Sequence, residues 1–504
     1  MLKQGWKGML AALGAVLALS GCGGGGGGGG GGSTVPTISS ATPGDSQVTL
    51  NWQAPFGMYY WVWWIQSTLP VTIGPNGNAV GSDVNAQPPY VVSGLINDFP
   101  YSFAINAHSG DPNAPGGPQS NSMAATPRFA GGNWIPCATT GSTCPAGAPT
   151  LYGVTFGDNA GILASDNGSL RYYLAVGSAG RMYASMDAKN WNPIPPQAPC
   201  TPAGGGALRA TDYGWGTFVV VGDNGTVCFS GLTYTNPTGL GLAFTPNYLQ
   251  ALWYPATTLP PGTGSVNFYA VNTNQNGWAA IGGAHVAVGS KGTIMWSGDG
   301  QNWFSPIFAN TTTSDLYDVA FNFCAVPFWS WVAVGANGTI IATADATGGT
   351  NWTTAGINVA TTQPLRTVAC TPNSTPVALP GYPPLIVTPL FLAAGDGGVL
   401  LSSVDGINWI APTNFKIDNV PATVFPVNIR RMTYGTQFVA VGDGGAVFTS
   451  LDGVNWISQK SNAGSTNLYA VTQPEGTTIP NGFMGAVSYG YLISGDNGFT
   501  AFGQ

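Results

Sequence analysis

The chain has few charged and few protonatable side chains. Among its 504 residues only 7% are charged, with a single glutamate, Glu475, and two histidines, His108 and His285. A Ser-His-Asp triad in the C-terminal part would have to use His285, which stands at the head of an apolar strand pattern. Because general acid–base chemistry needs such groups brought together, we expect no enzyme activity and no cofactor. The 13 basic residues against 20 acidic ones also argue against a nucleic-acid partner.

Cysteine is scarce too, and its spacing does not suit a metal site. The chain has 7 cysteines, no Cys-x-x-Cys pair and only two histidines, His108 and His285, so a zinc site, the rival explanation for these cysteines, is not expected. Apart from Cys22, the cysteines fit an oxidising compartment in which disulfides persist. Sequence alone leaves the connectivity open. The pairs predicted here are Cys137 with Cys144, Cys200 with Cys228, and Cys324 with Cys370.

Only one stretch is apolar enough to be a targeting segment. Residues 1–22 place Lys3 and Lys7 before an apolar run and end in Leu-Ser-Gly-Cys at Cys22. The basic start and short apolar run are typical of a secretory signal. The final tetrapeptide resembles the lipobox of bacterial lipoproteins, which implies that Cys22 is lipidated and becomes the mature N-terminus. Gly23 directly after it resembles the pattern sorted to the outer membrane.

Glycine forms an uninterrupted run from Gly23 to Gly32. Residues 23–34 are therefore predicted to be a flexible tether with an r.m.s. reach of roughly 16–19 Å. The expected location is outside the cytoplasm, attached by lipid to a bacterial outer membrane. The sequence leaves open whether the protein faces the periplasm or the cell surface.

Glycine and proline are abundant, and the chain contains a repeated unit whose strands are separated by glycine turns. With 75 Gly and 39 Pro, a turn-rich all-β protein is expected. The clearest unit is residues 438–456, FVAVGDGGAVFTSLDGVNW, which shows three short strands joined by two glycine turns. Weaker copies occur at residues 174–191, 286–303, 332–352 and 392–409, and shortened copies at 218–230 and 491–502.

Each copy follows another short apolar strand, so that seven units of four strands are predicted. Repetition of four-stranded units is typical of a β-propeller. We therefore predict a seven-bladed β-propeller over residues 129–504. The last unit has no Asn-Trp strand, whereas Asn133 and Trp134 precede the first unit. We expect the strand at 131–136 to complete the last blade and close the ring.

The second turn of several units carries Ser-x-Asp-Gly-x-Asn-Trp, as at Asp299, Asp405 and Asp452. This sequence resembles the Asp box of BNR-repeat propellers, in a form similar to that of propellers related to the photosystem II assembly factor. The resemblance implies the fold and says little about function. The aspartates of these turns recur in separate blades, so we expect them to cap turns rather than to converge on a catalytic site. They are Asp187, Asp299, Asp345, Asp405 and Asp452.

One position of each innermost strand is tyrosine or arginine. In a propeller these positions gather at one mouth of the central channel, where they form a candidate binding face. They are Tyr152, Arg209, Tyr269, Tyr317, Arg366, Arg430 and Tyr469. Every unit with arginine here has aspartate at its first turn. Ion pairs within single blades are predicted in preference to a free anion site, namely Arg209 with Asp223, Arg366 with Asp396, and Arg430 with Asp443.

Residues 35–127 resemble a fibronectin type III module. The resemblance rests on the alternating strand that ends at Trp52 and on Tyr101, placed as in a tyrosine corner. Residues 59–65, YYWVWWI, depart from it because aromatic side chains occupy both faces of one strand. The favoured interpretation is that the propeller covers one face. The alternative is an exposed aromatic platform of Trp61, Trp63 and Trp64.

Three functions remain compatible with these features. The first is a lipid-anchored binding or assembly protein that docks a protein or envelope component on its propeller. The second is a surface lipoprotein that binds or cleaves carbohydrate, with a polysaccharide as partner. The third is a structural component of an extracellular assembly.

Overall fold

The computed structural model describes residues 35–503 except 56, 75, 110–116, 133, 140–141, 159–170, 186, 196–199, 215–216, 231–252, 274–284, 308–311, 323–329, 345–350, 358–360, 372–389 and 474–489. Cys22 and the predicted tether lie outside these residues. The described chain is all-β, with only short 3-10 turns between strands. None of its helices has the length and apolar character needed to cross a membrane.

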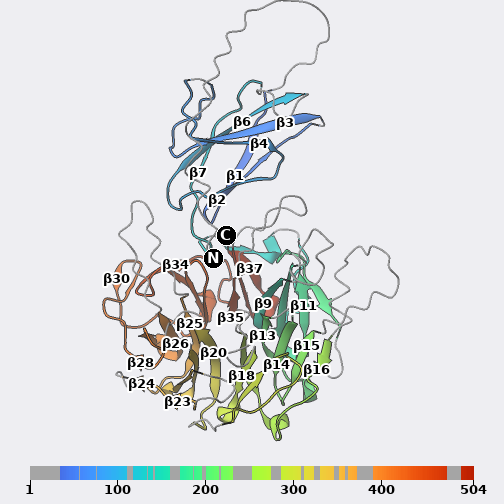
Figure 1. Ribbon diagram of the computed structural model, residues 1–504, viewed down its shortest axis with the longest axis vertical. Helices are drawn as coiled ribbons and strands as arrows, with labels where there is room; N and C mark the ends of the chain where they lie inside the picture. The colour runs from blue at the N-terminus through green and yellow to red at the C-terminus, as the bar shows by residue number, and fades with distance from the viewer. Residues whose placement is uncertain are drawn as a thin grey trace, which may run out of the picture.

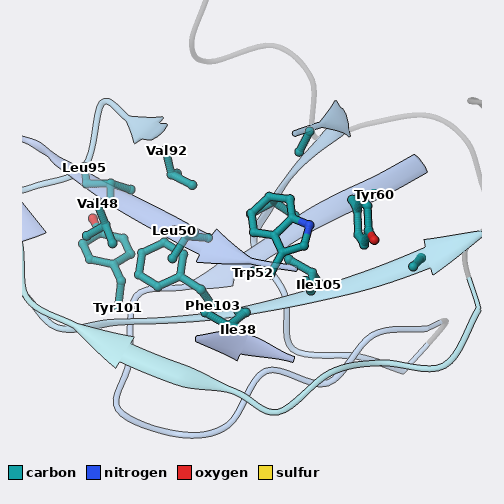
Figure 2. Close-up of a cluster of buried hydrophobic side chains, with 13 residues drawn as sticks. Ile38, Val48, Leu50, Trp52, Tyr60, Val92, Leu95, Tyr101, Phe103 and Ile105 are labelled. Carbon is teal, nitrogen blue, oxygen red and sulfur yellow. The ribbon is translucent and has the colours of Figure 1, made fainter. Parts of the chain in front are cut away.

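The N-terminal part is a sandwich of two antiparallel sheets (Figure 1). One sheet has the order β1 (Ile38–Gly44), β2 (Gln47–Trp52), β5 (Tyr90–Ser93). The other has the order β4 (Gly81–Ala86), β3 (Met58–Ile65), β6 (Tyr101–Ser109), β7 (Met123–Ala125). Alternate residues of the strands point into the space between the sheets, where Trp52, Tyr60 and Phe103 are buried (Figure 2).

A tyrosine fixes one corner of this sandwich. Tyr101 is buried at the start of β6, and its hydroxyl oxygen accepts a hydrogen bond from the Ile96 amide at 3.1 Å. The bond ties the strand to the loop that leads into it, as the sequence predicts for a tyrosine corner.

The rest of the described chain forms seven sheets, which lie together below the sandwich in Figure 1, and their innermost strands line a central channel. Each sheet begins with its innermost strand. These strands are β9 (Leu151–Asp158), β13 (Leu208–Gly214), β17 (Phe268–Thr273), β20 (Leu316–Asn322), β25 (Leu365–Cys370), β31 (Ile429–Tyr434) and β35 (Leu468–Thr472).

Two further antiparallel strands follow in every sheet. The second strands are β10 (Arg171–Gly177), β14 (Thr217–Gly222), β18 (His285–Gly289), β21 (Ser330–Gly335), β26 (Phe391–Gly395), β32 (Phe438–Gly442) and β36 (Tyr491–Gly495). The third are β11 (Met182–Ser185), β15 (Val227–Ser230), β19 (Ile294–Ser297), β22 (Ile340–Thr343), β27 (Leu400–Ser403), β33 (Val447–Ser450) and β37 (Thr500–Gly503).

The outer strands are shorter and more varied. Five sheets have a full fourth strand, namely β12 (Asn192–Ile194), β16 (Trp253–Pro255), β23 (Thr353–Thr354), β34 (Asn455–Gln459) and β8 (Trp134–Pro136). In the third and fifth sheets single bridges take this place, Trp296 with Phe304 and Ser402 with Ile410. Two parallel pairs link neighbouring sheets at the rim, β24 (Gly356–Ile357) with β28 (Asn408–Trp409), and β29 (Lys416–Ile417) with β34.

The sheets close into a ring. Every innermost strand packs against the innermost strand of the next sheet, and β35 of the last sheet packs against β9 of the first. Strand β8, from before the first repeat, pairs with β37, with Phe502 opposite Ile135 and Gly503 opposite Trp134. The predicted strand exchange is therefore present, and the arrangement is that of a β-propeller.

A buried tryptophan from the outer part of each sheet fills the space toward the preceding sheet. Trp409, for example, packs among Val332 of the fourth sheet and Phe391 of its own sheet. The full set is Trp191, Trp253, Trp303, Trp352, Trp409, Trp456 and Trp134. Large indoles suit this position because they bury much apolar area between twisted sheets.

The Asp-box aspartates cap their own turns, as predicted. In the fifth sheet Asp405 Oδ1 accepts hydrogen bonds from the Ile407 and Asn408 amides at 2.8 and 2.7 Å, and Oδ2 accepts one from Asn408 Nδ2 at 2.7 Å. Asp187, Asp299 and Asp452 make the same contacts. Burial raises the pKa of Asp405, but these bonds outweigh it and hold the pKa below its ordinary value. Asp345 lies outside the described residues.

Two of the three predicted disulfides are confirmed. Cys137 is bonded to Cys144, and Cys200 to Cys228, each with a Cα–Cα distance of 5.7 Å. Cys324 lies outside the described residues, so its pairing with Cys370 stays a prediction. The Sγ of Cys370 lies 3.2 Å from the Phe321 carbonyl oxygen.

The aromatic strand β3 differs from both interpretations of its sequence. Figure 1 shows β3 and β6 on the side of the sandwich away from the propeller sheets, so the prediction that the propeller covers these aromatics is wrong. Trp64 packs against the sandwich core over Gly81, on the inner face. Trp61 and Trp63 lie together on the outer face, with ring centroids 5.6 Å apart. The three indoles therefore do not form one platform, because neighbouring residues of a strand point to opposite faces.

Candidate functional site

The candidate site is the mouth of the central channel, where seven side chains form what we call the collar. The collar consists of Tyr152, Arg209, Tyr269, Tyr317, Arg366, Arg430 and Tyr469. Each is the second residue of its innermost strand, and each falls where the pairing register with the second strand shifts. Such a bulge leaves one residue without a partner and re-aims its side chain. Here it turns all seven side chains toward the axis.

A glycine lies opposite every bulge. In the sixth sheet Gly442 pairs with Ile429, and a Cβ on Gly442 would overlap the Asn428 carbonyl oxygen. The next residue, Asp443, donates its amide hydrogen to that same carbonyl at 3.1 Å. This contact places the Asp443 side chain beside Arg430. The equivalent contacts recur in the other six sheets.

The collar surrounds the opening of a cavity of about 380 Å³, and residues of all seven innermost strands line it. The predicted face is therefore brought together. Its arginines are about one-third exposed or less, with 33, 28 and 27% of the side chain of Arg209, Arg366 and Arg430 accessible. A ligand at the mouth would touch tyrosine rings and guanidinium groups at once.

The three arginines are paired, as predicted. Arg209 binds Asp223 through two hydrogen bonds, Nε to Oδ1 at 2.8 Å and Nη2 to Oδ2 at 3.1 Å. Arg366 and Arg430 bind Asp396 and Asp443 in the same bidentate way. Burial would raise the pKa of Asp443, but Arg430 and Asn428 lower it below the ordinary value. The collar is thus no free anion site, since each guanidinium group already donates two hydrogen bonds to an aspartate.

Ring contacts join the collar into a nearly continuous band. The guanidinium carbon of Arg209 lies 5.1 Å from the centre of the Tyr152 ring, and that of Arg366 lies 4.4 Å from the centre of the Tyr317 ring. These are cation–π distances. Tyr152 also packs against Tyr469, and Tyr269 against Tyr317, each pair at 5.4 Å. Arg430 reaches Asp396 of the neighbouring sheet at 3.5 Å. The band therefore holds adjacent sheets together at the mouth.

Deeper in the channel lies a second charged group that the sequence reasoning missed. Arg431 Nη1 lies 2.6 Å from Asp318 Oδ1, although the two residues are two sheets apart. Asp318 is 1% exposed and also accepts hydrogen bonds from Thr367 Oγ1 and the Val368 amide. Burial raises the pKa of Asp318 despite these partners. A usable signal existed, since charges are rare in this chain and these stand inside innermost strands.

Asp212 also faces this part of the channel. It lines the cavity, and protein surrounds its carboxyl closely enough that burial raises its pKa to about 7. Hydrogen bonds from Tyr213 and Thr273 and the charge of Arg431 act in the opposite direction. The Thr273 hydroxyl lies 2.8 Å from Nδ1 of His285. A buried polar chain thus connects the channel with the sheet interior.

His285 is a core residue. It is fully buried, Nε2 finds no hydrogen-bond partner among the described residues, and burial lowers its pKa to about 4. A histidine in this position has no access to a substrate. Among the described residues no group of His, Cys, Asp or Glu is arranged to hold a metal ion.

Comparison with known proteins gives distant structural likenesses. No protein-family model and no curated protein sequence matches the chain. Among solved structures it is similar to YCF48 bound to D1 peptide, with 15% identity, a TM-score of 0.45, and coverage of 74% of this chain and 94% of that one. It is also similar to YCF48 from Cyanidioschyzon merolae, with 14% identity, a TM-score of 0.44, and coverage of 74% of this chain and 98% of that one. For Saccharomyces cerevisiae Sqt1 the identity is 9%, the TM-score 0.44, and the coverage 72% of this chain and 98% of that one.

Proposed function

We propose that this protein is an exported, lipid-anchored binding or assembly protein of the bacterial outer membrane, and that the collar is its docking face. In this proposal the ring is a seven-bladed propeller of the Asp-box type, and the sandwich is a fibronectin type III module that spaces it from the membrane. The partner is a protein or another envelope component. No catalytic role is assigned to the chain.

The convergence of the collar is the observation that carries this proposal. Seven equivalent positions, separated by most of the chain, present four tyrosines and three paired arginines around one opening. Tyrosine and arginine are the residues most used at the centres of protein interfaces. Because the arginines are neutralised by aspartates, the face is polar and aromatic without a strong positive charge.

The point at which the sandwich joins the ring also supports the collar as the docking face. Ala130, just before the propeller, accepts a hydrogen bond from Gln437 Nε2 at 2.6 Å, and Gln437 is held by the Tyr491 hydroxyl. Gln437 lies in the turn between β31 and β32, at the end of β31 opposite Arg430. The sandwich therefore joins the ring on the face away from the collar. A lipid at Cys22 would leave the collar pointing away from the membrane.

Two experiments test the proposal. Metabolic labelling with palmitate should label the protein and not its Cys22→Ser variant, and the variant should leave the membrane fraction. Photo-crosslinking amino acids at Tyr469 and Tyr269 should capture a partner in intact cells. The same probe at Val404, on the outer rim, is the control. Equal capture at all three positions would contradict the collar as the docking face.

A carbohydrate-binding role remains a second candidate because of one observation. Trp61 and Trp63 lie side by side on the outer face of the sandwich, partly exposed. A glycan array with the purified protein and its Trp63→Ala variant tests this role. Binding that disappears in the variant would support it.

A further inference from the structure

The charges around the channel are unbalanced toward the negative. Each collar arginine is neutralised by one bidentate carboxylate. Two further aspartates, Asp496 and Asp315, stand at the mouth, and neither forms an ion pair within the described part of the chain. Asp496 accepts hydrogen bonds from Thr150 Oγ1 at 2.9 Å and from the Tyr469 hydroxyl at 3.4 Å. Asp315 accepts one from the Lys291 amide at 2.9 Å.

Each of these two aspartates lies beside a pair of tyrosines whose rings are in tilted contact. Asp496 is next to Tyr469, which packs on Tyr152, and Asp315 is next to Tyr269, which packs on Tyr317. Burial, followed by the neighbouring carboxylate, raises the pKa of both Tyr469 and Tyr269. A carboxylate next to aromatic rings is the combination that binds alkylammonium groups, through charge and cation–π attraction. Two such corners face one another across the mouth, in the last and third sheets.

A third carboxylate lies deeper on the same axis. Asp212 follows Arg209 by three residues in β13, roughly 10 Å farther along the channel at the rise of a strand. Arg431 lines the cavity and is paired with the buried Asp318, so Asp212 is the acid among the described lining residues that has no ion pair of its own. A linear aliphatic cation entering the mouth would therefore meet one carboxylate at the rim and another at depth.

We propose that the channel mouth binds alkylammonium groups, with Asp496 and Tyr469 at the rim and Asp212 at depth as the principal contacts. The source of such a group is either a lysine side chain on the docked partner or a free polyamine. The lysine source rests on the proposed docking function, whereas binding of the chemical group itself does not. The cavity volume of about 380 Å³ is sufficient for a chain of this size.

Titration calorimetry at pH 8.5, where Asp212 with its pKa of about 7 is ionised, tests this proposal directly with the purified mature chain. The probes are 1,5-diaminopentane, spermidine and Nα-acetyl-lysine methylamide, and the controls are 1,5-pentanediol and glutarate, which match the length without the positive charge. We expect the amines to bind and both controls to remain silent. Asp496→Asn and Asp212→Asn should each weaken amine binding by about tenfold, since each removes one charged contact.

Asp418→Asn is the matched control because the Asp418 carboxylate accepts its hydrogen bonds from the amide and hydroxyl of Ser458, at the outer strand of the sixth sheet and away from the collar. It should leave amine binding unchanged. Thermal melts of every variant verify folding, and the Asp496 variant decides the question if the Asp212 variant proves unstable. Glutarate binding without amine binding, silence of all probes, or amine binding that survives both substitutions would overturn the proposal.

The relative affinities separate the two sources. Binding of acetyl-lysine methylamide within about threefold of spermidine indicates a partner lysine, whereas much tighter spermidine binding indicates a free polyamine. Loss of amine binding in Asp496→Asn with unchanged crosslinking at Tyr269 would separate this site from the docking function. Loss of crosslinking with intact amine binding would leave the site and remove the proposed docking role.

Discussion

Aspartates stand at both ends of the fifth sheet, and their surroundings differ. Asp405, in the Asp box, is satisfied by groups of its own turn within three residues. Asp396, at the collar end, is satisfied by Arg366 of its own sheet and Arg430 of the next. The Asp405 contacts need only the turn, and the Asp396 contact with Arg366 needs only one sheet, whereas the Asp396 contact with Arg430 requires the assembled ring. The same residue type therefore stabilises a turn at one end and joins sheets at the other.

The largest effect should come from the glycine that permits the collar bulge. Gly442→Ala forces a Cβ into the Asn428 carbonyl, and we expect a loss on the order of 3 kcal/mol of unfolding free energy. Gly444→Ala, two residues on, is the control: its φ is +65°, but among the described residues no atom beyond its two chain neighbours stands within 4 Å of a Cβ. It should cost about 1 kcal/mol. Chemical denaturation measures both, and equal losses would contradict the close-approach explanation.

The next largest effect should be acid sensitivity arising from His285. Its pKa is about 4 in the folded protein and 6.5 as the ordinary value, so between these pH values the unfolded chain binds more protons. The stability present above pH 6.5 is therefore lost as pH falls toward 4, by about 3 kcal/mol. His285→Gln should lack this loss. Chemical denaturation at pH 7.5 and 4.5 gives the unfolding free energy of the wild type and of the variant. An equal loss between the two pH values in both proteins would show that His285 is not the source of the acid sensitivity.

A smaller loss is expected from removing the Asp-box carboxylate. Asp405→Ala deprives the Ile407 and Asn408 amides of their acceptor, which should lower the unfolding free energy by about 2 kcal/mol. Asp405→Asn keeps one acceptor oxygen and should lose about half as much. Thermal and chemical denaturation measure both variants. A melting temperature of Asp405→Ala equal to that of the wild type would contradict a stabilising role of the Asp405 cap.

Asp212 should have the opposite pH dependence from His285. Its folded pKa of about 7 lies above the ordinary value of 3.8, so its contribution is present below pH 3.8 and is lost as pH rises through 7. Asp212→Asn should therefore raise the melting temperature at pH 8.5 and leave it nearly unchanged at pH 4. We expect about 1–2 kcal/mol at most, because the carboxyl retains contact with the channel. A lower melting temperature of Asp212→Asn at pH 8.5 would contradict the buried environment inferred for the Asp212 carboxyl.

The smallest change in stability should come from the collar aspartate. Asp396→Asn removes a partly exposed ion-pair partner, so less than about 1 kcal/mol is expected. Its effect on binding should be larger, because Arg366 and Arg430 then have spare donors. Glutarate should begin to bind in calorimetry, and amine binding should weaken. An unchanged ligand preference would show that the ion pairs do not set the charge of the mouth.

Much of the fold follows from local patterns. Glycine turns and apolar alternation predict the repeated strands, and the position of Trp134 predicts the strand that closes the last sheet, confirmed by its pairing with Phe502 and Gly503. The arginine–aspartate pairs were predictable because each repeats at one spacing in a unit. The prediction of one aromatic platform was wrong in part because alternate residues of a strand face opposite sides, and only the folded sheet decides which set is inside: Trp64 points inward, and Trp61 and Trp63 outward.

The amino-acid sequence alone determines the features that residues close along the chain produce. These are the turns, the strands, the Asp-box caps and the equivalence of the collar positions. Ring closure decides the rest. Arg431 and Asp318 are 113 residues apart, and Asp212 meets Thr273 of the next sheet, so no local pattern brings these groups together. The physical reason is that contacts across the channel depend on the angle between successive sheets, which the packing of buried tryptophans fixes only when all the sheets are in place.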